Sequence, residues 1–500
     1  IGAGALLDTT TASNNTAVGG IALCANTTGA CNVAVGACAL LNNTTADDNT
    51  AVGMNALCLN TTGCRNTAIG HNSMDVNTTG EFNTALGRSS LSGNTTADNN
   101  TAVGYHSMLA NTTGTENTAV GSGALDSNTT AGCNTSIGHG SMGDNTEGGN
   151  NVAVGRSALG SNTTGASHVA IGRNSLTLNT TSTGNVAVGA FALDKNTTGG
   201  CNAGLGWQAL TANTTGTSNT SVGALSLLAN TTGSTNTAVG FCALNANTTA
   251  GDNTAVGKNS LLVNTTGTLN NAVGSGALMA NTTGSNNVAL GNDALRFNTT
   301  ADNNTAVGYQ ALFDNTTGTV NTAMGRQALQ NNTTADGNTA YGHNTLNTAT
   351  TNGCNTAVGG SVLFNATGHS NTGVGHSALS GLTSGNENTG VGRDVMGAAV
   401  TGAGNSSLGY FTLNALTSGS TNTAVGNGSS PILTTGSNNT TVGAAAGISL
   451  TTGSNNLLLG HDAGRSGSPG GLINTGSNQV VLGDENITDL FCADTSISSS

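Results

Sequence analysis

Basic, aromatic and histidine side chains gather at one place in a 17-residue repeat that fills most of this chain. The repeat reads N-T-A-V-G-x-x-A-L-x-x-N-T-T-G-x-x, and its positions are numbered here from Asn15. Such side chains could form an edge that contacts a ligand or a receptor; the alternative, which we favour, is an exposed loop that tolerates any side chain after a turn. Position six holds Arg88, Arg156, Arg173, Lys258, Arg326 and Arg393, then Trp207, Tyr105, Tyr309 and Tyr410, and then His71, His139, His343, His376 and His461.

The remaining residues that could do chemistry do not combine into a catalytic or metal site. Acidic residues such as Asp47, Glu81 and Asp98 lie at the variable end of the repeat, without the G-G-x-G-x-D pattern of calcium-binding repeats. The histidines lie several repeats apart, too far to share a metal ion. No nucleophile has a histidine or an acid at a fixed offset. We therefore expect no enzyme, no catalytic or metal residue and no cofactor.

The cysteines give no disulfide framework within the chain. Cys24 and Cys58 share position ten but lie two repeats apart, and Cys31 and Cys64 are separated in the same way. If each repeat is one layer, two layers span about 10 Å, which is beyond the reach of a disulfide. We expect free thiols or bonds between chains, and the spacing shows no zinc pattern. The ten cysteines are Cys24, Cys31, Cys38, Cys58, Cys64, Cys133, Cys201, Cys242, Cys354 and Cys492.

Position twelve is an asparagine that could either carry sugar or form a ladder. Eighteen repeats read N-T-T there, which is an acceptor for N-glycosylation. From Leu382 onward the asparagine is replaced, for example by Ala399 and Leu416, while hydroxyl residues such as Thr417 and Thr434 persist. The hydroxyls therefore have a role of their own, and we favour stacked Asn and Thr ladders over glycans. The acceptor residues are Asn26, Asn43, Asn60, Asn77, Asn94, Asn111, Asn128, Asn162, Asn179, Asn196, Asn213, Asn230, Asn247, Asn264, Asn281, Asn298, Asn315 and Asn332.

The elements that position these side chains are short strands and turns. The segment T-A-V-G suits a brief strand closed by a turn, and no helical period is present. The glycine at position five recurs in every full repeat, which predicts a positive φ or no room for a Cβ atom. We predict an all-β parallel β-solenoid or β-roll of 17-residue coils. About 27 coils at about 4.8 Å would span on the order of 130 Å. The first of these glycines are Gly19, Gly36, Gly53, Gly70, Gly87 and Gly104.

Five positions of the repeat lead to expectations about the interior of the coil and about contacts between chains. Positions four and nine, as in Val18 and Leu23, are the only large apolar columns, and we expect both to be buried. Positions three and eight are mostly alanine, which would suit close contact of chains around a shared axis. This favours three chains over one. Position one is asparagine in every repeat of the periodic body except at His168, which predicts an amide ladder.

Composition and pattern set the domain organisation and the partner classes. We expect a solenoid shaft over 1–455, whose pattern changes near residue 366, irregular last coils over 456–483 and a tail over 484–500. Charged residues make up only 7 % of the chain, and the net charge is -13. Ten basic residues spread over the whole length give no footing for nucleic acid. No segment approaches the roughly 18 apolar residues of a membrane span, so no membrane insertion is expected.

Parts of the chain resemble known fibrous proteins. The units 151–155, 168–172 and 185–189, which read N-V-A-V-G, H-V-A-I-G and N-V-A-V-G, resemble the N-S-V-A-I-G repeats in heads of trimeric autotransporter adhesins. That resemblance implies a trimeric β-roll, although the family's repeat is shorter. The full repeat with its N-T-T segment is similar to repetitive shafts of phage and virus tail fibres. Residues 478–500 resemble the segment before the intramolecular chaperone of endosialidase-type fibres, which implies trimerisation and cleavage after Ser500.

Together these patterns predict a structural protein. We expect a non-enzymatic shaft of an extracellular or virion fibre, a tail fibre or adhesin, that self-associates as a homotrimer and displays an element that binds a surface receptor or glycan at one end. The alternatives are an N-glycosylated cell-surface filament and, third, an ice-binding solenoid with a flat array of threonines at positions thirteen and fourteen.

Overall fold

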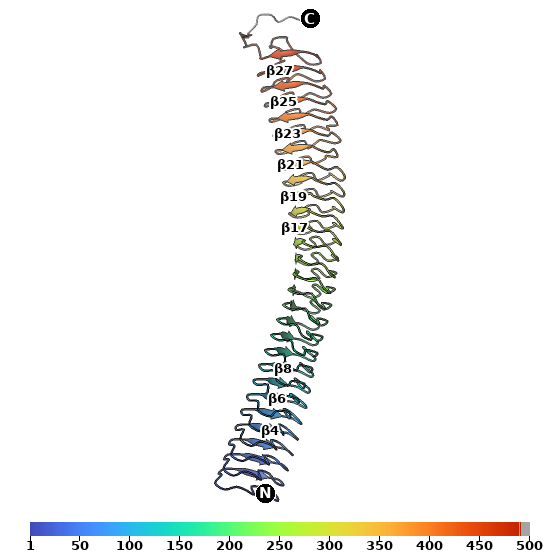
Figure 1. Cartoon of the computed structure of the whole chain (residues 1–500). Coiled ribbons are helices and arrows are strands. Elements are labelled where there is room, and N and C mark those ends of the chain that lie inside the picture. Colours follow the sequence, from blue (N-terminus) through green and yellow to red (C-terminus); the bar gives the residue numbers. More distant parts are fainter. Residues whose placement is uncertain (490, 492–500) are drawn as a thin grey trace. The chain divides into compact units, whose positions relative to one another are not determined.

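The chain is a parallel β-solenoid, which confirms the predicted fold class. The computed structural model describes residues 1–489 and 491, and within these it contains strands and turns but no helix (Figure 1). Two compact units divide the chain, Ile1–Asn259 (unit 1) and Ser260–Ser500 (unit 2). Each unit by itself is a stack of coils. The predictions that concern Cys492 and cleavage after Ser500 lie outside the described residues.

Unit 1 contributes one three-residue strand per coil. Consecutive strands pair in parallel with a register of one repeat, so that Thr16 lies beside Val33 and Ala17 beside Ala34. The strands are β1 Thr16–Val18, β2 Val33–Val35, β3 Thr50–Val52, β4 Thr67–Ile69, β5 Thr84–Leu86, β6 Thr101–Val103, β7 Thr118–Val120, β8 Thr135–Ile137, β9 Val152–Val154, β10 Val169–Ile171, β11 Val186–Val188, β12 Ala203–Leu205, β13 Thr220–Val222, β14 Thr237–Val239 and β15 Thr254–Val256.

Unit 2 keeps this pairing through two changes of repeat length. One step is a residue short, where Thr356 pairs with Thr372, and the last is longer, where Leu457 pairs with Val480. The strands are β16 Asn271–Val273, β17 Val288–Leu290, β18 Thr305–Val307, β19 Thr322–Met324, β20 Thr339–Tyr341, β21 Thr356–Val358, β22 Thr372–Val374, β23 Thr389–Val391, β24 Ser406–Leu408, β25 Thr423–Val425, β26 Thr440–Val442, β27 Leu457–Leu459 and β28 Val480–Leu482.

Backbone hydrogen bonds join neighbouring coils well beyond the strands. The N–H of Thr50 donates to the carbonyl of Asn66 at 2.8 Å, at the start of the strand. On the other side of the coil, the N–H of Leu57 donates to the carbonyl of Ser73 at 3.1 Å. Each coil therefore offers the next a nearly complete row of donors and acceptors, which is why one repeat can template another.

The glycine at position five closes each strand in a conformation that excludes other residues. In the six glycines named above, φ lies between 133° and 142°. A Cβ atom on Gly104 would also lie 2.5 Å from the carbonyl oxygen of Gly121 in the next coil. Only glycine combines this φ with this close approach of two backbones.

The inward side chains come from positions one, three, eight, nine and twelve, and from position fifteen where it is alanine, as at Ala46. In the third coil, Ala51, Ala56 and Leu57 are all fully buried. The prediction that the alanine columns contact other chains is therefore wrong, because these methyl groups already fill the inside of their own coil. Leu57 has a φ of 50°, which costs free energy for a branched side chain, and burial of its side chain offsets that cost.

The prediction that position four is buried is also wrong. Side chains alternate across a strand, so an inward alanine at position three turns its two neighbours outward. Val18 is 40 % exposed while Ala17 beside it is 7 % exposed. In unit 1 the core therefore contains one large apolar column, at position nine, and the remaining inward volume is filled by small side chains and amides.

Two asparagine ladders complete the interior, as the sequence predicted. The backbone N–H of Asn49 donates to Oδ1 of Asn32 at 2.9 Å, and its own Nδ2 donates to the carbonyl of Gly63 at 3.0 Å. At position twelve, Nδ2 of Asn60 donates both to Oδ1 of Asn43 and to the same Gly63 carbonyl, each at 2.9 Å. The two columns thus meet at position fifteen, and at Asn332, the last asparagine of the position-twelve ladder, the buried Oδ1 has no hydrogen-bond partner.

Candidate functional site

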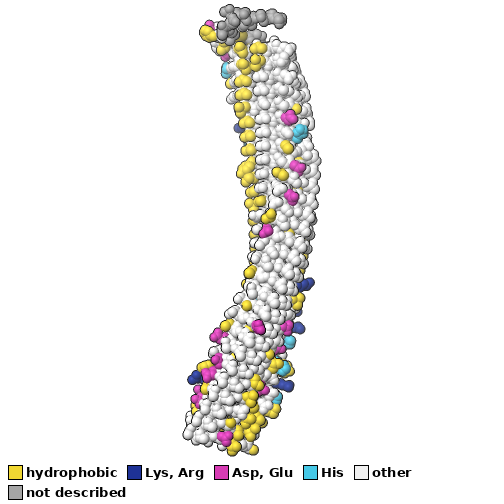
Figure 2. Space-filling view, viewed as in Figure 1, with side chains coloured by type: hydrophobic (Ala, Val, Ile, Leu, Met, Phe, Trp, Pro, Cys, Tyr) yellow, Lys and Arg dark blue, Asp and Glu magenta, His cyan; other side chains and the backbone are white. Residues whose placement is uncertain are grey.

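In each unit the outward residues of the strands form a surface that we call the sheet face. It consists of the first and last residue of each strand, from β1 to β15 in unit 1 and from β16 to β28 in unit 2. The last residue is apolar in every strand, and many of these side chains are 36–50 % exposed. In unit 2 the hydrophobic side chains make an unbroken line in Figure 2, along the edge where Figure 1 places β17–β27.

The sheet face carries no charge. The strand sequences contain no Asp, Glu, Lys, Arg or His, although the chain has 33 charged residues other than histidine, 10 basic and 23 acidic. Two residues beyond the strand, position six is exposed and charged in several coils, for example at Arg156 and Lys258. Charge is thus tolerated beside the sheet face but does not occur on it.

Position six does not form a single binding edge. Its aromatic side chains are exposed, with Trp207 at 52 % and Tyr105 at 48 %. The guanidinium of Arg88 lies over the ring of Tyr105, with 5.9 Å between Cζ and the ring centroid. Arg173 pairs in the same way with Phe191, at 4.7 Å. These are isolated pairs of adjacent coils, and they support the interpretation of a tolerant loop.

The asparagines of the N-T-T segments lie inside the solenoid. All eighteen, from Asn26 to Asn332, are fully buried. Asn145 belongs to an N-T-E segment that is no glycosylation acceptor, yet it occupies the same ladder, donating to Asn128 at 3.1 Å and accepting from Asn162 at 2.7 Å. The ladder therefore accounts for the asparagine without sugar. Glycosylation of these asparagines stays a prediction. In the folded coil, each Nδ2 atom is buried and already donates hydrogen bonds, so there is no room for a sugar on it.

The threonines after these asparagines divide into two columns. At position thirteen, Oγ1 of Thr61 donates to the carbonyl of Thr78 at 3.0 Å, and Thr417 donates to Thr434 at 3.1 Å where the asparagine has been lost. Position fourteen, such as Thr62, is exposed. The two hydroxyls of a pair therefore differ: the one at position thirteen is part-exposed and already donates to the next coil, whereas position fourteen is exposed.

Where the ladder ends, apolar side chains take its place. Leu382, Leu416 and Leu433 are fully buried at position twelve. In one coil the sequence placed Ala399 in this column, but the structure exposes Ala399 and buries Val400 instead. The chain is displaced there by one residue, because a larger apolar side chain fills the inward space better than alanine does.

The cysteines and titratable groups of the described residues form no disulfide and no metal-holding group. All nine described cysteines are free thiols. Burial raises the pKa of the Cys58 thiol, and the neighbouring Cys38 and Asp75 add to this effect. Within residues 1–489 and 491, no group of three or more His, Cys, Asp or Glu side chains is placed to hold a metal ion. Nor does any helix long and apolar enough to cross a membrane occur in that part of the chain.

His168 replaces an asparagine of the position-one ladder and makes the same two backbone contacts as that asparagine would. Its Nδ1 accepts the backbone N–H of Asn185 at 3.1 Å, and Nε2 lies 2.8 Å from the carbonyl of Ser182. An imidazole with its proton on Nε2 satisfies both contacts and needs no charge. Burial lowers the pKa of His168, only partly opposed by these two backbone contacts.

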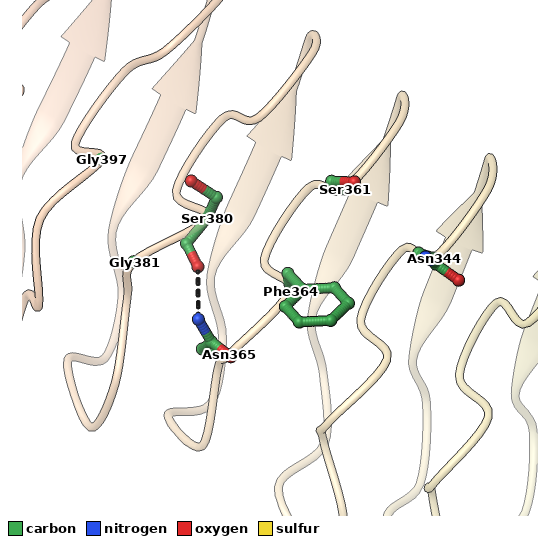
Figure 3. Close-up of a pocket in the computed structure, with 7 residues that line it drawn as sticks. All are labelled: Asn344, Ser361, Phe364, Asn365, Ser380, Gly381 and Gly397. Atoms are coloured by element: carbon green, nitrogen blue, oxygen red, sulfur yellow. Dashed lines mark hydrogen bonds between the residues drawn. The ribbon is translucent and has the colours of Figure 1, made fainter.

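A hollow of about 370 Å³ lies in unit 2, on the side of the coils that carries positions seven to eleven. Figure 3 shows the ring of Phe364 in it, between the amides of Asn344 and Asn365. Nδ2 of Asn365 donates to the carbonyl of Ser380 at 3.3 Å. A second hollow of about 540 Å³ continues from it and shares Ser380 and Gly397 with it.

Comparison with known proteins adds no family to these observations. No protein-family model matches the chain, and no curated protein matches it. The interpretation of its surfaces therefore depends on the geometry alone.

The sheet face and the hollow were both missed by reasoning from the sequence. A signal for the first existed: in a three-residue strand, adjacent positions three and four cannot both face the core. A signal for the second is the one shortened repeat, from Asn355 to Asn371, followed by small residues at Ser380 and Gly397.

Proposed function

We propose that this chain is the shaft of an extracellular or virion fibre in which three copies associate through their sheet faces. The observation that carries the proposal is the unbroken, uncharged, half-exposed apolar column on that face. Contiguous exposed apolar patches of more than a few hundred Å² are typical of interaction surfaces.

The size of the sheet face suits association of copies. Covering the exposed parts of the apolar column of unit 1 would contribute on the order of 10 kcal/mol. That is comparable with the roughly 4–15 kcal/mol that association costs, and the flanking column of threonines and valines adds further contact. A second copy repeats the same side chains at the same spacing, so the columns can pack in register over every coil.

Charge also favours a second copy over other partners. Two chains that each carry a net charge of -13 repel one another, and the uncharged sheet face is a surface through which they can approach with little repulsion. Each face has two outward columns, so each chain can contact two neighbours. This supports three chains around an axis, as the resemblance to trimeric adhesins implies.

The test compares charge on the sheet face with charge elsewhere. Ile137 and Ile171 are each 39 % exposed on that face, so Ile137→Asp with Ile171→Asp should leave the coils folded and shift the sedimentation profile toward single chains. The matched control is Thr113→Asp with Thr130→Asp at exposed position fourteen, where the chain itself carries Glu147. The control should sediment like the parent. A sheet-face variant that also sediments like the parent would contradict the proposal.

The two alternative functions give different results in other measurements. A glycosylated filament would show excess mass in the denatured chain, which the buried Nδ2 atoms oppose. If the protein binds ice, the parent chain would show thermal hysteresis, and substitution of the exposed threonines at position fourteen would abolish it.

A further inference from the structure

The hollow in unit 2 arises from a particular pair of positions in neighbouring coils. Elsewhere the side chain at position ten contacts position seven of the preceding coil: Oγ1 of Thr211 donates to the carbonyl of Phe191 at 2.9 Å, and Nδ2 of Asn245 donates to that of Leu225 at 2.9 Å. In these two coils the side chain at position ten therefore spans the gap to the preceding coil.

Between 361 and 397 both partners become small. Ser380 takes position ten against Ser361, and Gly397 takes it against Ser377. The repeat that leads into this region is one residue short, as the pairing of Thr356 with Thr372 shows. Glycines occupy the same pair in unit 1, where Gly143 stands against Gly123 and Gly160 against Gly140, so the region of the two hollows differs from those coils by the shortened repeat that precedes it.

The groups that line the hollows are neutral and include unpaired donors and acceptors. The hydroxyls of Ser361 and Ser380 and the amide of Asn344 make no hydrogen bond to other described residues, while all three lie at the hollow (Figure 3). Phe364 lines the first hollow and Phe411, 41 % exposed, lines the second. Hydroxyls, amides and aromatic rings together are the groups that recognise sugar rings, by hydrogen bonds to hydroxyls and contact with C–H faces.

The charge balance opposes an ionic ligand. The one acidic residue of the lining, Asp394, is paired with Arg393, with 3.2 Å between Oδ2 and Nε. No lysine or arginine lines either hollow. An anion would meet no free cation here, and a cation would compete with Arg393.

We propose that these joined hollows bind a neutral carbohydrate chain laid across consecutive coils, with its rings against Phe364 and Phe411. The two hollows follow one another along the coils and share Ser380 and Gly397, an arrangement that suits an internal stretch of a polymer. This carbohydrate site lies on the side of the solenoid and goes beyond the proposed shaft role. The two proposals are independent, because the site does not require the shaft role and gives no support to it.

The experiment uses saturation-transfer NMR and calorimetry on the full chain with maltohexaose, cellohexaose, chitohexaose and a mannan oligomer as probes. At least one should bind the parent. Ser380→Leu refills the hollow with the side chain that Leu228 provides at the same position of another coil, so the coil should fold and binding should be lost. Phe411→Ala should weaken binding by about fivefold to tenfold through lost ring contact.

The matched control is Thr211→Leu, the same substitution at position ten in unit 1, which should bind like the parent. The proposal is overturned if none of the probes binds, if Ser380→Leu binds as well as the parent, or if a heparin hexasaccharide binds better than every neutral probe. Sedimentation of the same samples reports association through the sheet face separately, so failure of this site and failure of the shaft proposal are distinguishable.

Discussion

Coils with asparagine at position twelve and coils with leucine there solve one structural problem in two ways. From Asn26 to Asn332 the inward side chain is an amide that donates to the preceding coil and to its own position fifteen, as Asn43 does at 2.9 and 3.0 Å. From Leu382 to Leu450 it is a fully buried aliphatic side chain. The strand, the glycine turn and the threonine ladder are the same in both regions. The coil therefore requires a filled interior, and hydrogen bonding is one of two ways to fill it.

The largest effect should come from the turn that both regions share. Gly206 in unit 1 and Gly426 in unit 2 have φ values of 139° and 133°, and a Cβ atom on either would lie within 2.7 Å of backbone atoms of the next coil. We expect Gly206→Val and Gly426→Val each to destabilise the local coils by more than about 4 kcal/mol. Hydrogen exchange would show lost protection over the neighbouring coils. Equal, small effects would mean that the close approach of backbones is not needed.

Exchanging asparagine and leucine at position twelve should destabilise both regions, but by different amounts. Asn213→Leu removes the acceptor of Nδ2 of Asn230, 2.8 Å away, and should cost about 1–3 kcal/mol. Leu433→Asn should cost about 3 kcal/mol, because it removes apolar contact and buries an amide beside Leu416 and Leu450, which offer no ladder partner. Local hydrogen exchange measures both. If either swap were neutral, the fillings would be interchangeable and the ladder would carry no specificity.

His168 allows the ladder to be broken by pH at one coil. Burial lowers the pKa of His168 in the folded chain below the value of about 6.5 that it has when unfolded. The unfolded chain then binds more protons, so stability is complete above about pH 6.5 and falls as the pH decreases below it. Exchange protection at 168–185 should drop between pH 7 and pH 5. His168→Asn should remove this dependence, and an unchanged profile in that variant would contradict the role of the imidazole.

The smallest effect should be alike in the two regions. Oγ1 of Thr214 donates to the carbonyl of Thr231, and Oγ1 of Thr434 to that of Thr451, each at 3.0 Å. Thr214→Val and Thr434→Val should each cost about 1 kcal/mol. Thermal unfolding or local hydrogen exchange would measure this loss of stability. A cost confined to the asparagine region would mean that the threonine ladder depends on the amides beside it.

Periodicity made the coil predictable, while the assignment of faces failed. The glycine turn, the one-repeat register and the asparagine ladder follow from residue types that recur at fixed spacing, such as Asn49 and Gly53. Val18 was expected inside because hydrophobic residues usually are, but the alternation of a short strand places it outside once Ala17 is inside. The hollow near Ser380 depends on side chains 19 or 20 residues apart in adjacent coils, and a one-dimensional pattern does not show which columns touch.

The exposed column at position four is the feature on which the functional account depends. The most direct measurement is the native mass of the parent chain at micromolar concentration, by light scattering or mass photometry, with the intact mass of the denatured chain beside it. The account predicts a native mass three times that of the chain. A native mass equal to that of one chain would contradict it, because the sheet face would then be left uncovered in solution.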